Sequence, residues 1–161
     1  MYKTLSSKLV LIFIVFMIAV MATVGIFLLN SVFDFYTNEF LSQMQDGFSE
    51  DITSKLSDAL DDNDPTDTQK QLMLAYAGVF GLDNHRHFYI LDKNANILAS
   101  SDDTISLAKT QNLLTAMNGK NGFSQSQGTE FLDYAVYIES QDGQRNSIIY
   151  VKEDLADMRQ L

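Results

Sequence analysis

The 161-residue sequence contains no cysteine and a single proline, Pro65. Without cysteine, neither a disulfide framework nor a thiolate zinc site is available to the fold. Acidic residues are absent from the first thirty positions, where Lys3 and Lys8 are the only charged side chains. The rest of the chain carries 21 acidic and nine basic side chains, a formal net charge of −12. Such an acidic domain repels phosphate backbones, so we expect no nucleic-acid partner.

Residues 9–29, LVLIFIVFMIAVMATVGIFLL, contain no charge. As a helix this segment spans about 31 Å, which matches the hydrocarbon core of a bilayer. Because the lysines precede it, the positive-inside rule places residues 1–8 in the cytoplasm and the acidic remainder outside. A cleaved signal peptide is the alternative, with a candidate cleavage site after Ala22. The apolar run continues well beyond that site, which favours an uncleaved membrane anchor.

An apolar stripe at helical spacing follows the span. Its members are Phe33, Tyr36, Phe40, Met44, Phe48, Ile52, Leu56 and Leu60. No proline interrupts the chain before Pro65, so we expect one helix to run from the membrane to about residue 60. The stripe either covers a sheet or forms the seam of a parallel homodimer near the membrane. A long regular coiled coil is not predicted, because the spacing is closer to four than to 3.5.

A second helix is predicted from Pro65 to Gly81. Asp64 and Pro65 form a good N-cap and first-turn pair, and Gly81 can end the helix. The face expected to point inward consists of Leu72, Met73, Tyr76, Val79 and Phe80. The acidic residues around Asp64 lack the order of an EF-hand loop, so we expect a solvated loop rather than a cation site.

The remainder of the chain alternates between strand and helix patterns. The predicted strands are 87–91, 97–99, 123–127, a strand around 132–139 and 147–152, with a hairpin at Asp142-Gly143. A helix is predicted over 106–118, with Leu107, Leu113, Leu114 and Met117 inward and Gly119 as its stop, and another begins at 153. The sequence therefore predicts an α+β fold, in which the long helix packs on a roughly five-stranded antiparallel sheet.

No spacing in the sequence is typical of a catalytic site. A glycine-rich phosphate loop, a nucleophile elbow and a zinc-protease histidine pair are all missing, so we expect neither an enzyme nor a cofactor. His85 and His87 would face the same side of a strand, as two metal ligands could, but no spacing supplies a third ligand. We therefore expect polar residues at a strand edge rather than a metal site.

The predicted ligand-binding residues are Arg86, His87, Tyr89, Tyr134 and Tyr137. We expect any pocket on the sheet face away from the long helix, although strand alternation divides these residues between the two faces. Arg86 points opposite to the histidines and either neutralises an anionic ligand or pairs with a nearby carboxylate. The alternative for the tyrosines is that they are ordinary core and edge residues.

One membrane span, a long helix, and the segments FYILDKNANILASSDD and LDYAVYIESQDGQRNSIIYVKEDLADM together resemble a known family. They are similar to the extracytoplasmic PAS-like (single Cache) sensor domains of bacterial two-component histidine kinases. In that family the first hairpin commonly has Asp, then Gly three residues later, then Ser. Asp92 and Ser100 or Ser101 match, whereas Ala95 stands where glycine is usual. Asn94 tolerates a left-handed conformation, so the turn can still form.

The resemblance implies a sensor domain at residues 30–152 and the start of an exit helix at 153–161, leading toward a second membrane span. It also implies a homodimer in a bacterial cell membrane that serves as the signal-sensing input of a histidine kinase, without the kinase part. The same module could belong to a chemoreceptor or to a cyclic-dinucleotide enzyme. A stand-alone, membrane-anchored binding or adhesion protein is the alternative from another class. The signal itself is not predicted.

Overall fold

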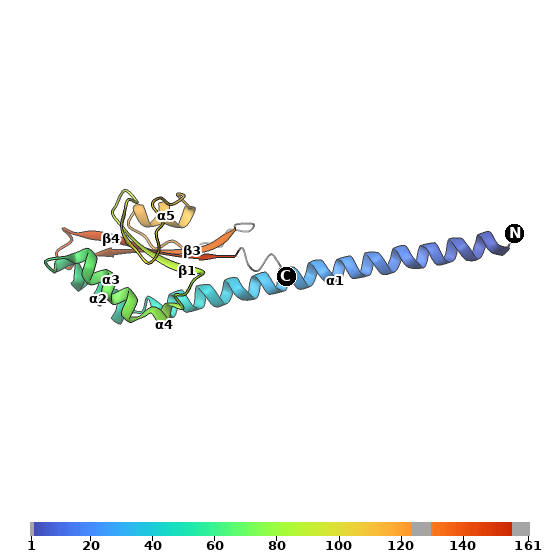
Figure 1. Cartoon of the computed structure of the whole chain (residues 1–161), viewed down its shortest axis with the longest axis horizontal. Helices are drawn as coiled ribbons and strands as arrows, with labels where there is room; N and C mark the ends of the chain where they lie inside the picture. Colours follow the sequence, from blue (N-terminus) through green and yellow to red (C-terminus); the bar gives the residue numbers. More distant parts are fainter. Residues whose placement is uncertain (1, 124–129, 156–161) are drawn as a thin grey trace. The chain divides into compact units, whose positions relative to one another are not determined.

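The computed structural model describes residues 2–123 and 130–155 (Figure 1). The chain forms two compact units, residues 1–38 and residues 39–161. Helix α1 (Tyr2–Gly47) makes up the first unit and supplies the start of the second. By length and composition this helix could cross a membrane, and its most apolar part is not buried by protein. A signal sequence would meet the same criterion, so the two interpretations of the N-terminus both remain.

The prediction of one helix reaching residue 60 is wrong. Helix α1 ends at Gly47, and α2 (Glu50–Asp58) and the short η1 (Ala59–Asp61) follow. At the break, the Phe48 ring lies 4.7 Å from the Phe80 ring and stacks at 5.8 Å on Tyr134, and Ser49 is the N-cap of α2. A Cβ atom at Gly47 would lie 2.7 Å from the Phe80 ring, so glycine permits this close approach.

The apolar stripe is divided between two environments. Its residues Phe40, Met44, Ile52, Leu56 and Leu60 are buried in the second unit. That part of the stripe therefore serves as core, which is the first of the two roles considered. In the first unit, the stripe residue Tyr36 is exposed, as are its apolar neighbours Val32 and Phe35.

The second predicted helix exists but is broken into α3 (Pro65–Ala75) and α4 (Ala77–Phe80). As predicted, the Asp64 carboxylate caps α3 by accepting the Asp67 N–H at 3.1 Å, and Gly81 ends α4 with φ of +61°. Phe80 is fully buried, whereas Val79 is 44% exposed, so its predicted inward orientation is wrong.

The sheet has four antiparallel strands in the order β2-β1-β4-β3 among the described residues. The strands are β1 (Arg86–Leu91), β2 (Ile97–Ser100), β3 (Phe131–Glu139) and β4 (Asn146–Asp154). The fifth strand was predicted at 123–127, of which 124–127 lie outside the described residues. Nearby, Gly122 forms an isolated bridge to Ala135.

The exit helix predicted from residue 153 is wrong at its start, because Glu153 and Asp154 belong to β4. They pair with Arg86 and Phe131, respectively, and these ladder hydrogen bonds favour the extended conformation. Residues 156–161 of that prediction lie outside the described residues.

Helix α5 (Gln111–Met117) is shorter than the predicted 106–118. It begins late because the Thr110 hydroxyl accepts the Leu113 N–H at 3.1 Å and caps the first turn there. Gly119 follows the helix with φ of +76°. Leu113 is fully buried, whereas Leu114 is 39% exposed, so the prediction that Leu114 points inward is wrong.

Helices cover both faces of the sheet within the second unit: α2 and α3 lie on one side and α5 on the other (Figure 1). On the first face, buried Gln69 of α3 donates to the Ser147 hydroxyl of β4 at 2.9 Å. On the second face, α5 closes an apolar core. Its buried members are Tyr89, Leu91, Leu113, Ala116, Ala135, Ile148 and Tyr150. We call the two sides the α3 face and the α5 face.

The turn between β1 and β2 places Ala95 at φ of +67°. The Asp92 carboxylate enforces this geometry by accepting the N–H groups of Asn94 and Asn96, each at 2.8 Å. The residue that adopts the left-handed conformation is thus Ala95, at the position where the resembled family commonly has glycine, and not Asn94. A Cβ atom in this conformation is strained.

Candidate functional site

A polar cavity of about 360 Å³ lies at the end of the sheet where β1 begins and β4 finishes. Its lining residues are Asn84, His85, His87, Tyr89, Asp102, Thr104, Lys152 and Asp154. His87 pairs with Lys152 across the two central strands, and alternation places both on the α5 face together with Tyr89. We call this hollow the β1–β4 cavity.

One wall of the cavity is a hydrogen-bonded group around Asp102. The carboxylate accepts the Tyr89 hydroxyl at 2.8 Å, and the Thr104 hydroxyl and N–H at 2.7 and 3.1 Å. Burial acts to raise the pKa of Asp102, but these hydrogen bonds outweigh it and the pKa lies below its usual value. Burial raises the pKa of Tyr89 to about 12. At neutral pH the wall therefore presents a carboxylate and a neutral phenol.

His87 is oriented by the loops on both sides of it. Its Nε2 lies 3.2 Å from the Asn84 carbonyl oxygen, which can only accept, so a hydrogen bond here requires a proton on Nε2. Its Nδ1 lies 3.3 Å from the Ser101 hydroxyl, and that hydroxyl also accepts the Phe88 N–H at 3.0 Å. The imidazole thus connects the start of β1 to the loop that follows β2.

Lys152 and Asp154 supply the charges on the β4 side of the cavity. The Lys152 ammonium lies 4.6 Å from the centre of the Phe131 ring, a favourable cation–π contact. Within the described part of the chain, Lys152 has no ion-pair partner. The Asp154 N–H donates to the His85 carbonyl at 2.8 Å, which fixes the end of β4 beside the start of β1.

Across residues 2–123 and 130–155, no group of three or more histidine or carboxylate side chains is placed to hold a metal ion. His85 and His87 do line the same cavity, as the strand pattern suggested, but they gain no third ligand there.

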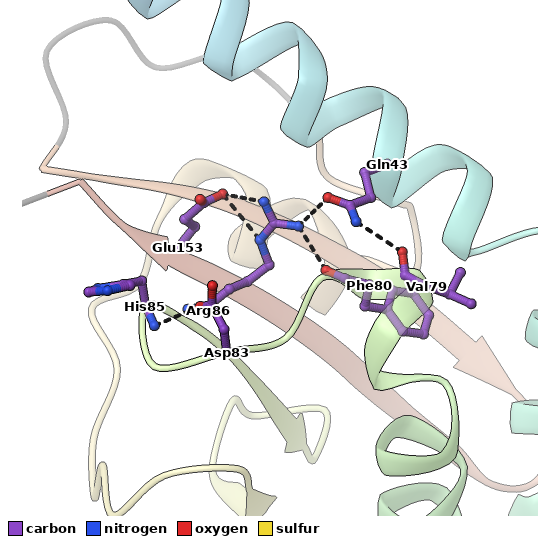
Figure 2. Close-up of polar contacts among 7 residues, drawn as sticks. All are labelled: Gln43, Val79, Phe80, Asp83, His85, Arg86 and Glu153. Atoms are coloured by element: carbon purple, nitrogen blue, oxygen red, sulfur yellow. Dashed lines mark hydrogen bonds and ion pairs between the residues drawn. The ribbon is translucent and has the colours of Figure 1, made fainter. Parts of the chain in front are cut away.

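Directly behind the cavity, Arg86 binds three other segments on the α3 face (Figure 2). Its Nε and Nη2 donate to Glu153 Oε2 at 3.1 and 2.7 Å. Its Nη1 donates to the side-chain oxygen of Gln43 in α1 and, at 2.8 Å, to the Phe80 carbonyl at the end of α4. We call these four residues the Arg86 clasp.

The clasp is closely packed. Arg86 is only 9% exposed, and its guanidinium lies 5.1 Å from the centre of the Phe40 ring. Gln43 also donates to the Val79 carbonyl at 3.2 Å, which fixes its amide. A Cβ atom at Gly81 would lie 2.6 Å from Arg86 Nη1, so a residue with a side chain would displace the guanidinium.

Of the five residues predicted to bind ligand, His87 and Tyr89 line the β1–β4 cavity. Arg86 lies on the other face and pairs with a carboxylate, which is the second of its two predicted roles. Tyr134 is buried on the α3 face, against Phe48. Tyr137 lies on the α5 face without reaching the cavity. The tyrosines outside the cavity are thus core or edge residues.

Sequence reasoning missed Asn84, Asp102, Thr104, Lys152 and Asp154, and it considered His85 only as a metal ligand or a polar residue at a strand edge. Lys152 carried a usable signal, because antiparallel pairing of the two central strands sets it opposite His87. The polar run SSDDT, residues 100–104, was a second signal, since a polar loop directly after an edge strand can fold over the sheet end.

No family model matches the sequence, and no curated protein matches it. The fold itself is α+β: a long apolar N-terminal helix, then helices packed on a four-stranded antiparallel sheet.

Proposed function

We propose that this chain is the extracytoplasmic sensing module of a bacterial membrane receptor of the two-component histidine kinase type. One observation carries the proposal: the β1–β4 cavity and the Arg86 clasp occupy adjacent positions on the same two strands. His87 and Lys152 pair across the strands and face the cavity, and their neighbours Arg86 and Glu153 pair across the same strands and face the clasp. A polar hollow and a packed ion pair thus share the same two strands.

The clasp connects the strands that line the cavity to helix α1. It holds Gln43, which belongs to the same helix as the apolar segment that could cross a membrane. Occupation of the cavity that moves the backbone at His87 or Lys152 would strain the neighbouring Arg86–Glu153 pair. If the pair has two arrangements of similar energy, a ligand that favours one of them changes the state of α1.

The sequence supports the remaining parts of the proposal. Lys3 and Lys8 before the apolar segment favour a cytoplasmic N-terminus, and the net charge of −12 after it suits an exported domain. The resemblance to PAS-like sensor domains favours a homodimer in the bacterial cell membrane. The bilayer is the partner of residues 9–29.

The test is the output of the receptor that contains this chain. In membranes, Glu153→Gln should change basal autophosphorylation at equal protein level, because it weakens the clasp without emptying its space. Arg145→Ala is the matched control: Arg145 also donates to backbone carbonyls, those of Leu60 and Asp62, but lies outside the clasp. Equal output from the wild type and both variants would contradict the proposal.

The main alternative is a stand-alone, membrane-anchored binding or adhesion protein, which the polar cavity would serve equally well. A chemoreceptor or a cyclic-dinucleotide enzyme could use the same input module. The coding sequence downstream of residue 161 distinguishes the histidine kinase from the stand-alone protein. A second apolar span followed by a kinase supports the proposal, whereas a stop codon favours the stand-alone protein.

A further inference from the structure

We infer that the β1–β4 cavity binds a small zwitterion, a molecule that carries one ammonium and one carboxylate group. As the identity of the signal, this inference rests on the proposed function, but binding itself can be measured without it. It follows from the charges of the cavity, the groups that are available there, and the size of the space.

The charges that line the cavity have both signs. Lys152 contributes one positive charge, and Asp102 and Asp154 contribute two negative charges. A ligand with only negative groups would be repelled by Asp102, and a ligand with only positive groups would be repelled by Lys152. Like charges in a partly enclosed site repel strongly, so a ligand that presents one charge of each sign satisfies the cavity best.

Lys152 is the partner for the carboxylate end of the ligand. Its ammonium has three donors, rests against the Phe131 ring, and has no ion-pair partner among the described residues. A carboxylate beside this ammonium would form a charge-assisted hydrogen bond, the strongest class that proteins make.

Asp102 is the partner for the ammonium end. A carboxylate has about four acceptor positions. Three acceptor positions of the Asp102 carboxylate are occupied: Oδ2 accepts the Tyr89 and Thr104 hydroxyls, and Oδ1 accepts the Thr104 N–H. The remaining position on Oδ1 is available to a ligand. Because the same bonds hold the carboxylate rigidly and keep it ionised, the site is preorganised for a cation.

The size of the cavity limits the ligand to a small molecule. About 360 Å³ lies at the lower end of ligand sites, which are roughly 300–1,000 Å³. The cavity cannot extend along the α5 face, because buried Leu91, Tyr150 and their neighbours fill the sheet centre. A molecule of the size of a free α-amino acid fits these limits.

The test is a titration calorimetry series on the full chain in detergent micelles. The probes are the twenty protein amino acids and, for each that binds, its two single-charge analogues; for alanine these are ethylamine and propionate. We expect at least one amino acid to bind at least about tenfold more tightly than either analogue, because each lost ion contact is worth that much. If no amino acid binds at 10 mM, or if an analogue binds as well as its parent, the inference is wrong.

Two variants test whether Lys152 binds the carboxylate of the ligand and Asp102 binds its ammonium group. Lys152→Met should weaken binding of the amino acid about tenfold or more and leave the amine analogue unweakened. Asp102→Asn should weaken binding of the amino acid by a similar factor and leave binding of the carboxylate analogue unweakened. A purely structural role would weaken all three probes together, which would contradict the assignment. Lys93→Met and Asp103→Asn, which change exposed residues outside the cavity, are the matched controls.

The binding experiment and the test of the proposed function can fail independently of each other. Selective binding of an amino acid without any effect of Glu153→Gln on receptor output would support the ligand and reject the sensor. A changed output without amino-acid binding would support the sensor and reject the ligand.

Discussion

Arg86 and Glu153 face each other across β1 and β4, and the guanidinium donates two hydrogen bonds to one carboxylate oxygen, at 3.1 and 2.7 Å. One residue further along β1 and one residue back along β4, His87 and Lys152 form the next cross-strand pair and face the opposite side of the sheet. The two pairs share their backbone. A ligand that displaces the backbone at the polar pair in the cavity is therefore expected to strain the ion pair in the clasp.

Breaking the ion pair should destabilise the fold. Glu153→Ala leaves the Arg86 charge nearly buried and without its carboxylate, and loss of one partner of such a pair costs about 3 kcal/mol. Urea unfolding of the wild type and variant measures the loss. The double variant Arg86→Met/Glu153→Met should recover most of it, since no lone charge is then buried. A loss below about 1 kcal/mol for Glu153→Ala would contradict the structural role of the pair.

Two neighbouring glycines should respond to alanine in opposite ways. Gly81→Ala introduces a Cβ atom 2.6 Å from Arg86 Nη1 at a residue with φ of +61°, so we expect a loss of about 2 kcal/mol or more. Gly78→Ala meets no atom within 4 Å and lies inside helix α4, so we expect a gain of about 0.5–1 kcal/mol. Thermal unfolding of both variants checks this, and equal shifts would be the contrary result.

Ala95→Gly should stabilise the protein. It relieves the strain of an alanine at φ of +67°, worth about 1–2 kcal/mol, against a smaller entropic cost of glycine in the unfolded chain. We therefore expect a net gain of about 0.5 kcal/mol in urea unfolding. Ala99→Gly, in β2, is the control and should destabilise, because glycine weakens a strand. Destabilisation by Ala95→Gly would show that the packing of its methyl group outweighs the strain.

The stability should depend on pH through Asp102. Its pKa in the folded protein lies below the usual 3.8, so its hydrogen bonds stabilise fully above that value. The contribution is lost as the pH falls through the folded-state pKa. Asp102→Asn should therefore cost about 1 kcal/mol at pH 7 and less near pH 3, in urea unfolding at both values. An equal cost at the two pH values would contradict this, and Asp103→Asn should have little effect at either.

The elements that sequence predicted correctly depend on local chemistry. Asp64 before Pro65 caps α3, Gly81 and Gly119 follow helices, and residues 142–143 lie in the β3–β4 turn, because each signal acts within a few residues of itself. The break after α1 was not predictable in this way. The helical spacing continues through Phe48, and at the break its ring contacts Phe80 and Tyr134, which are distant in the sequence.

The site was predictable only in part for a similar reason. His87 and Tyr89 follow from strand alternation alone. Lys152 reaches them through the register of β1 and β4, and Asp102 through a loop whose path depends on its bond to Tyr89. The sequence could not decide between the two predicted roles of Arg86, because nothing in it indicates that Gln43 and Glu153 surround this residue.

The central claim is that the Arg86 clasp controls a dimeric α1 helix, and disulfide cross-linking in membranes tests it most directly. The chain has no native cysteine, so single cysteines at positions 31–48 report without interference. Cross-linking should follow a helical period in the first unit, with maxima at the exposed Val32, Phe35 and Tyr36, and should be weak at Phe40 and Met44 because these residues are buried in the second unit. Glu153→Gln should change the intensities. A flat profile, or a profile that this variant leaves unchanged, would contradict the account.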